Sequence, residues 1–291
     1  MRSILMCGLV AGIGSVVALP PVGASADDAV APYVVTTRED VQRMLDLAGV
    51  VPGDFLIDLG SGDGRIPIAA AERGALSIGI EIDGDLVALA RQRATDAGVD
   101  ARAQFVVGNV FTASIAEASV VTLYLMPEVN LQLRPRLLCE LQPGTRVVSN
   151  TFTMGEWSAD AHVPGRTSGG LLLWVVPDRA GGQWQLDASN DVIRISQRFQ
   201  QLEISLRWQG GALATGQGQL RGSQLTWMGE DPEGARYRAS ARVHGDSLSG
   251  VLWRQAPGSE APERRPFRAN RSDATDLETE GSPDQACQQR P

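Results

Sequence analysis

The residues Asp58-Leu59-Gly60-Ser61-Gly62-Asp63-Gly64-Arg65 decide the fold of the first half of the chain. An apolar run, residues 55–57, precedes them, and a helix-like run, residues 66–73, follows. This order predicts a strand, a glycine turn and a helix, because glycine adopts positive φ and lets the backbone approach a ligand closely. The acid at the strand end places negative charge where a phosphate would otherwise bind. The turn therefore favours a neutral or cationic nucleoside ligand over a pyrophosphate.

A second acid has the spacing of a ribose partner. Glu81 ends another apolar run, residues 75–80, about 20 residues past the turn, as in dinucleotide-binding α/β units. One carboxylate can accept hydrogen bonds from both ribose hydroxyls. The three alternating glycines put the third one residue too early for the nicotinamide fingerprint G-x-G-x-x-G. A tight turn that binds nothing is the alternative, and the pair of acids argues against it.

Strands and helices continue to alternate up to about residue 176. Helices are expected at 85–97 and 127–141, and further strands at 103–107, 119–125, 146–150 and 171–176. This alternation predicts an α/β fold with a doubly wound, mostly parallel sheet. Ligands in such sheets bind outside the carboxyl ends of the strands. Four residues at or just past strand ends are therefore expected to cluster: Asp58, Glu81, Asn109 and Tyr124.

The periodicity changes from residue 182 onward. Short runs that alternate polar and apolar residues are separated by glycine turns such as Gly210-Gly211. This pattern predicts a small antiparallel β domain, a sandwich or barrel, over residues 182–255. Its role as a packing module or as a ligand or partner surface stays open. Residues 256–291 contain few apolar side chains and predict a disordered tail.

The N-terminus has the form of a leader. Met1-Arg2 precedes an apolar run, residues 4–19, and the small-residue site Ala24-Ser25-Ala26. This pattern is typical of a signal peptide, residues 1–26, and predicts an exported or periplasmic protein. No stable membrane insertion is expected after cleavage, because the run is shorter than the roughly 20 residues that span a bilayer. An uncleaved leader would leave the chain cytoplasmic or membrane-anchored, and a misassigned start codon is a third explanation.

Composition narrows the classes of partner. The net charge of −8 over 291 residues argues against a nucleic-acid partner, since such proteins carry a basic stripe. Cys7, Cys139 and Cys287 form no metal-binding spacing with histidine, so no metal is expected. Cys139 lies in a helical pattern and is expected in the core. Neither this composition nor the motifs predict an oligomeric state.

The turn and the acids together resemble the class I S-adenosylmethionine-dependent methyltransferases, over a domain of residues 33–178. The resemblance implies S-adenosyl-L-methionine as the cofactor. It implies the cofactor-binding residues Asp58, Gly60, Ser61, Gly62, Gly64, Glu81, Asn109 and Tyr124. The pattern departs at Asn109, where many such enzymes carry an acid near the adenine amino group. An Asn oxygen still accepts that hydrogen bond, but without charge assistance.

Further motifs narrow the resemblance to one group of these enzymes. The segments Tyr33-Val34-Val35-Thr36, Gly79-Ile80-Glu81-Ile82-Asp83 and Leu123-Tyr124-Leu125-Met126-Pro127 are similar to mitochondrial protein-lysine methyltransferases of the ATP synthase c subunit and the adenine nucleotide translocase, and to their bacterial relatives. The resemblance implies a protein substrate that carries the target lysine. Aromatic and acidic side chains suit an ammonium group, and the substrate candidates are Tyr33, Glu128, Glu156 and Trp157. Each could instead serve packing or helix capping, and no catalytic residue is identified.

Two other functions stay open at this level. The chain could be an exported envelope binding protein that keeps the methyltransferase fold as a scaffold, or a small-molecule methyltransferase. Export would separate the enzyme from a cofactor made in the cytosol. The chain also lacks lysine, since all 26 basic residues are arginine. A GC-rich genome or avoidance of self-methylation would each explain that bias.

Overall fold

A computed structural model describes residues 36–165, 169–187 and 189–273. Tyr33, the expected leader and residues 274–291 lie outside this range. The helices and strands follow in chain order: α1 (Arg38–Ala48), β1 (Phe55–Leu59), α2 (Arg65–Glu72), β2 (Leu76–Glu81), α3 (Gly84–Asp96), β3 (Ala103–Val107), β4 (Val120–Leu123), α4 (Pro127–Glu140), β5 (Arg146–Asn150), β6 (Ala161–Val163), β7 (Leu171–Val175), β8 (Gly182–Leu186), β9 (Val192–Arg198), β10 (Gln201–Arg207), β11 (Leu213–Arg221), β12 (Gln224–Glu230), β13 (Arg236–His244), β14 (Ser247–Gln255) and β15 (Glu263–Asp273).

The first seven strands form one mixed sheet, in the order β3-β2-β1-β4-β5-β7-β6. Strands β1 to β5 pair in parallel, whereas β7 runs antiparallel to both β5 and β6. The sheet extends from β1 through β2 and β3 on one side, and from β4 through β5 on the other, so the strand order changes direction between β1 and β4. This architecture confirms the predicted doubly wound, mostly parallel sheet.

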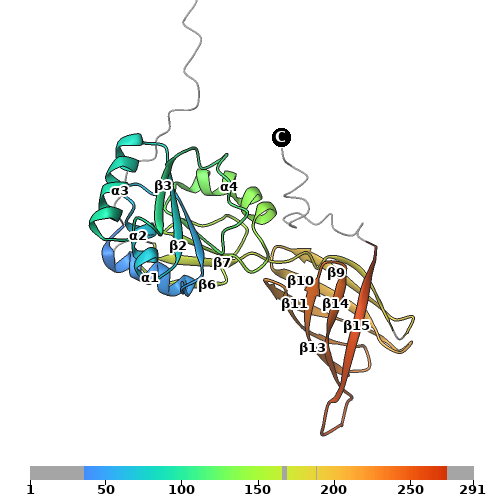
Figure 1. Cartoon of the computed structure of the whole chain (residues 1–291). Helices are drawn as coiled ribbons and strands as arrows, with labels where there is room; N and C mark the ends of the chain where they lie inside the picture. The colour runs from blue at the N-terminus through green and yellow to red at the C-terminus, as the bar shows by residue number, and fades with distance from the viewer. Residues whose placement is uncertain (1–35, 166–168, 188, 274–291) are drawn as a thin grey trace, which may run out of the picture. The chain divides into compact units, whose positions relative to one another are not determined.

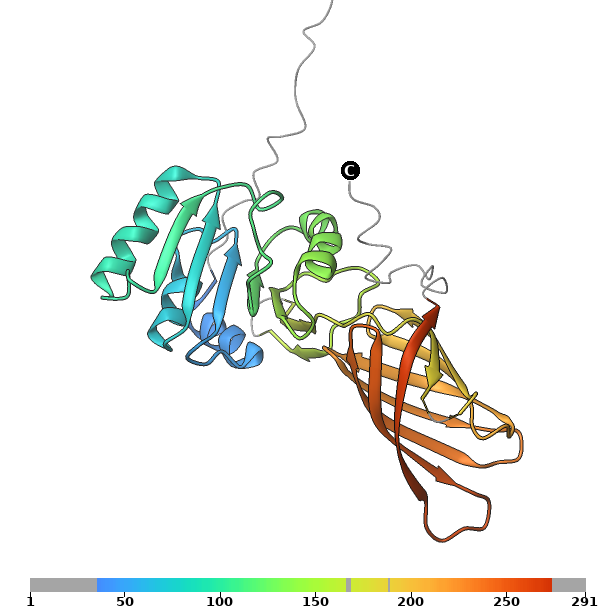
Figure 2. The ribbon, with the colours of Figure 1, turned by 45° about the vertical axis from the view of Figure 1, so that its right-hand side comes forward.

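Helices cover both faces of this sheet (Figure 2). Residues of α1 and α2 pack with Leu56, Val120 and Val148 on one face, and α3 packs there against β3. Residues of α4 pack with Ile57 and Val121 on the other face. Because successive strand residues point to opposite faces, both faces of β1, β4 and β5 are apolar, and this explains their continuous apolar runs.

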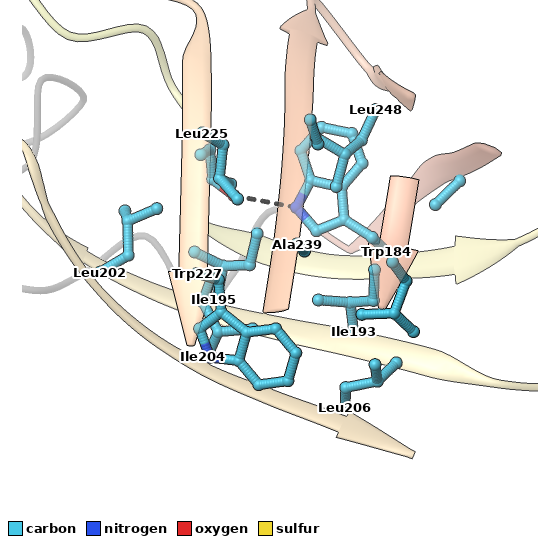
Figure 3. Close-up of a cluster of buried hydrophobic side chains, with 14 of the residues drawn as sticks. Trp184, Ile193, Ile195, Leu202, Ile204, Leu206, Leu225, Trp227, Ala239 and Leu248 are labelled. Carbon is cyan, nitrogen blue, oxygen red and sulfur yellow. Dashed lines mark hydrogen bonds between the residues drawn. The ribbon is translucent and has the colours of Figure 1, made fainter. Parts of the chain in front are cut away.

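The remaining strands, β8 to β15, form a closed antiparallel barrel, in the order β10-β11-β12-β13-β14-β15-β8-β9. This resolves the predicted sandwich or barrel in favour of a barrel. Apolar side chains from opposite strands point toward one another in its interior (Figure 3). Trp184 is fully buried and donates from Nε1 to the carbonyl oxygen of Ala180 at 2.8 Å. The interior leaves a cavity of only about 20 Å³, so it is a packed core, as expected for a barrel of this size.

One predicted boundary is wrong. Residues 263–273, expected in a disordered tail, form β15 and close the barrel between β14 and β8. The segment is mostly polar because its side chains alternate between solvent and the interior, and only Ala269 among them is fully enclosed. Its strand conformation depends on partners far away in sequence, so local composition does not reveal it. No helix in the described residues has the length and apolar character to cross a membrane.

Candidate functional site

Three parallel strands bring the predicted residues to one edge of the sheet. Asp58 on β1 is the Cα partner of Gly79 on β2 and of Thr122 on β4. Glu81 is the last residue of β2, and Tyr124 directly follows β4. Carboxyl ends of neighbouring parallel strands share an edge, so these residues lie at the position where α/β sheets bind ligands.

The glycine turn has the backbone geometry that the sequence predicts. Gly60, Gly62 and Gly64 all have positive φ, at 77°, 51° and 82°. Residues that carry a Cβ rarely adopt this backbone conformation. The amide of Gly62 donates to Glu81 Oε2 at 2.8 Å. The other oxygen, Oε1, accepts from the amides of Ile82 and Asp83 at 2.8 and 3.1 Å. Glu81 therefore faces the turn and holds it in place, with remaining lone pairs for a further donor.

Packing against neighbouring side chains also requires two of the glycines. A Cβ on Gly60 would lie 2.6 Å from Leu125 Cδ2, and one on Gly64 would lie 2.7 Å from Phe105. The Ser61 hydroxyl points inward, since it lies 2.5 Å from the place of a Cβ on Gly79. It is buried and has no hydrogen-bond partner in the described structure. Ser61 thus contributes to the turn through its backbone, and its hydroxyl packs against the sheet.

Asp63 anchors the helix end of the turn. Its buried carboxylate forms ion pairs with Arg65, at 2.5 Å, and with Arg93 of α3. Arg65 also donates to the carbonyl oxygen of Thr36, just before α1. Through Asp63 and Arg65, these contacts link the start of α2 to α3 and to the residue before α1.

Asp58 is the electrostatic centre of the edge. It is 2% exposed, and Oδ1 accepts from the Thr122 hydroxyl at 2.6 Å. Burial raises the pKa of its carboxyl to about 7, the hydrogen bond from Thr122 opposes this rise, and the charges of Glu81 and Asp63 add to it. Within the described residues it has no ion-pair partner. A buried carboxyl near two other acids, with no cation beside it, suits a ligand that brings positive charge.

The other two predicted cofactor residues lie at the same edge. Asn109 follows β3 and is exposed. Its side-chain oxygen accepts from the amide of Phe111 at 2.8 Å and keeps a second lone pair for another donor. Tyr124 is half-buried and stacks on Phe152, with ring centroids 6.3 Å apart. The roles of these residues toward a ligand stay predictions.

The substrate candidates are scattered. Glu128 lies exposed in the first turn of α4, and the Glu156 side chain is 67% exposed. Trp157 is fully buried and packs against Trp174, with ring centroids 6.0 Å apart, a placement that favours its packing interpretation. Tyr33 lies outside the described residues. Only Glu128 remains close in sequence to the ligand-binding edge.

Sequence reasoning missed two polar residues at this edge. Thr122 donates a hydrogen bond to Asp58. In the sequence it is recognisable only as the single hydroxyl residue within the apolar run 120–123. Asn130 of α4 is fully buried; its Nδ2 donates to Ser149 Oγ at 3.3 Å, while its Oδ1 lacks a partner in the described structure. The sequence does not reveal that the Asn130 side chain is buried, because its burial depends on packing against β5.

Known proteins share the segment that builds this edge. Residues 58–161 match the family model described as the ANTKMT methyltransferase domain. A protein-lysine N-methyltransferase of Saccharolobus islandicus is 44% identical over 129 residues, which are 44% of this chain and 80% of that protein. A human lysine N-methyltransferase of the ATP synthase c subunit is 34% identical over 164 residues, 55% of this chain and 70% of that protein. An RNA methyltransferase structure from Salinibacter ruber, in complex with S-adenosyl-L-homocysteine, is 50% identical, covers 50% of this chain and 95% of that one, and has a TM-score of 0.49.

The doubly wound sheet with its glycine turn and two acids defines a methyltransferase. The chain belongs to the family of protein-lysine N-methyltransferases that carry the ANTKMT domain. Its cofactor is S-adenosyl-L-methionine, which supplies a methyl group bound to a positively charged sulfur. The residues at the edge fit that molecule, because the buried Asp58 carboxyl lacks a cation within the described residues and Glu81 keeps acceptor capacity.

Proposed function

We propose that this protein transfers the methyl group of S-adenosyl-L-methionine to the side-chain amine of a lysine in another protein. Identity to the archaeal and human lysine methyltransferases, together with the family-model match over residues 58–161, carries this proposal. The buried Asp58 supports it from the structure, since it calls for a cationic ligand. Neither alternative function gains support from a comparable observation.

In this proposal the protein acts mainly by placing two molecules. The glycine turn, Asp58 and Glu81 hold the cofactor at the carboxyl ends of β1 and β2. Methyl transfer from a sulfonium requires a nucleophile in line with the methyl carbon, and orientation supplies most of the rate. The protein needs no covalent intermediate for this reaction, so no Ser, Cys or His nucleophile is required.

The acceptor lysine would enter beside β4 and β5. Tyr124 and Phe152 present stacked aromatic faces there, which attract an ammonium group. Asn130 Oδ1 is a buried acceptor without a partner among the described residues and would accept a hydrogen bond from the amine. Removal of water favours the neutral amine, because burial lowers the pKa of lysine.

The site of action is a separate part of the proposal. The leader pattern of residues 1–26 supports export to the periplasm. Cys139 is half-buried in α4 and not enclosed in the core as the sequence predicts. The sequence of the mature N-terminus measures export directly: a start at Asp27 supports export, and a retained Met1 contradicts cleavage.

The absence of lysine gives a clean assay for the reaction. The purified chain is incubated with methyl-labelled S-adenosyl-L-methionine and protein extract from a strain that lacks its gene, and methylated lysines are identified by mass spectrometry. Every labelled lysine must belong to an acceptor, since the enzyme has none. We expect lysine labelling that disappears with the Asp58→Asn variant. Label found only on small molecules would instead support the small-molecule alternative.

A further inference from the structure

Five arginines without acidic partners lie on one outward face of the barrel. Arg236, Arg238 and Arg242 occupy outward positions of β13, and Arg264 and Arg268 occupy outward positions of β15. All five are exposed. None forms an ion pair with a described residue. We call the outward side of β13, β14 and β15 the arginine face.

The register of the strands arranges these side chains in rows across the face. Arg238, Trp253 and Arg264 are Cα partners on successive strands. Arg242, Ser249 and Arg268 form a second row. Strand β14 lies between β13 and β15 (Figure 1). Neighbouring strands lie about 4.8 Å apart, so each row has one arginine on either side of β14.

Acidic side chains do not offset the positive charge of this face. The whole chain carries a net charge of −8, yet the outward positions of the three strands hold no acidic residue between 236 and 272. Arginines elsewhere in the same strands are satisfied: Arg271 pairs with Asp246, and Arg254 donates to Tyr237. Clustered like charges repel one another unless an anionic partner neutralises them.

Apolar side chains are interspersed with the arginines. Met228 on β12 is 70% exposed and is the Cα partner of Arg238. Val251 and Trp253 on β14 are half-buried on the same face. Positive charge combined with tryptophan and aliphatic side chains matches a lipid headgroup region, where cations meet phosphates and apolar groups meet the acyl boundary. We propose that the arginine face binds the surface of an anionic lipid bilayer.

A nucleic acid fits this face less well. Single-stranded nucleic acids bind by stacking bases on aromatic rings. The one tryptophan on the face, Trp253, is covered by the Arg238 guanidinium, 4.9 Å from its centroid. The imidazole of His244 lies at the last position of β13, beyond both rows of arginines. Met228 and Val251 offer no stacking surface. The face therefore suits headgroups, and this inference does not depend on the proposed methyl transfer.

Vesicle co-sedimentation of the full chain tests the proposal. The vesicles contain phosphatidylglycerol mixed with phosphatidylcholine, or phosphatidylcholine alone. The test variant carries Arg236→Gln, Arg238→Gln and Arg242→Gln. The matched control carries Arg194→Gln, Arg207→Gln and Arg221→Gln, which removes three exposed arginines from β9 to β11.

We expect binding to the anionic vesicles that weakens with salt and falls roughly 100-fold in the test variant, since each arginine near such a surface contributes about 5-fold. The control variant should bind within about 3-fold of the original chain, because salt screens charges far from the membrane. Equal binding to neutral vesicles, or equal losses in both variants, would overturn the proposal. Loss of binding to an RNA oligonucleotide in the test variant, with no vesicle binding by the original chain, would also overturn it.

Discussion

At the scale of single residues, Asp58 links stability to ligand binding. Its carboxyl has a pKa of about 7 in the folded protein against an ordinary value of 3.8. As the pH rises between these values, the unfolded chain loses this proton while the folded chain keeps it. The folded state then binds more protons, so this group lowers the free energy of unfolding as the pH rises, and the penalty is complete above pH 7.

Replacement of Asp58 by Asn should remove that penalty. We predict that Asp58→Asn raises the free energy of unfolding at about pH 8, by up to about 4 kcal/mol, and changes it little at about pH 4. Urea denaturation of both chains at the two pH values measures the difference. A variant with a lower free energy of unfolding at the higher pH would show that burial of the Asp58 carboxylate does not destabilise the fold.

The same carboxyl should make cofactor binding pH-dependent. S-adenosyl-L-methionine carries positive charge and favours the ionised form of Asp58. We predict that its affinity falls about tenfold for each pH unit below 7, and that Asp58→Asn binds weakly with little dependence on pH. Isothermal titration across this range provides the measurement. Affinity that improves toward acid pH in the original chain would contradict this role.

At the scale of elements, the sequence predicts those structures whose determinants are local. The glycine turn, the first acid and the following helix appear where expected, because positive φ and hydrophobic periodicity are encoded within about ten residues. The composition of residues 263–273 predicts a tail and not the strand β15, because the pairing of this strand with β14 and β8 depends on distant residues. The same reason hides the burial of Asn130, which β5 encloses.

The turn should be sensitive to a single methyl group. Gly64→Ala places a Cβ 2.7 Å from Phe105 at a φ of +82°. We predict a loss of about 3 kcal/mol from backbone strain and overpacking together. The matched control is Gly98→Ala, where φ is +66° and nothing lies within 4 Å, and the loss should be about 1 kcal/mol. Equal losses in thermal denaturation would show that packing around the turn is loose.

Closure of the barrel should depend on its last strand. A chain that ends at residue 262 lacks β15 and leaves the edges of β14 and β8 unpaired. We predict loss of the near-ultraviolet circular dichroism that arises from the enclosed Trp184 and Trp227. A chain that ends at residue 273 keeps every described strand pair and should retain that signal. Retention by the shorter chain would mean that the barrel closes without β15.

At the scale of the whole molecule, a methyltransferase sheet and a closed barrel share one chain. Asp58, Glu81, Asn109 and Tyr124 lie at one edge because each is at or just past the carboxyl end of a parallel strand. The strand topology alone predicts this placement, without any side-chain contact. The substrate candidates rest on residue type alone, and one of them, Trp157, is fully buried. Residue type therefore predicts a site only where topology also fixes its position.

Direct binding of S-adenosyl-L-methionine tests the central claim most sharply. Titration calorimetry of the folded full chain should show saturable one-site binding, reduced at least tenfold by Glu81→Ala, which removes the acceptor that faces the turn. The control Glu128→Ala removes an exposed acid of α4 and should bind as the original chain does. A folded chain that shows no binding at all would contradict the claim that this edge holds the methyl donor.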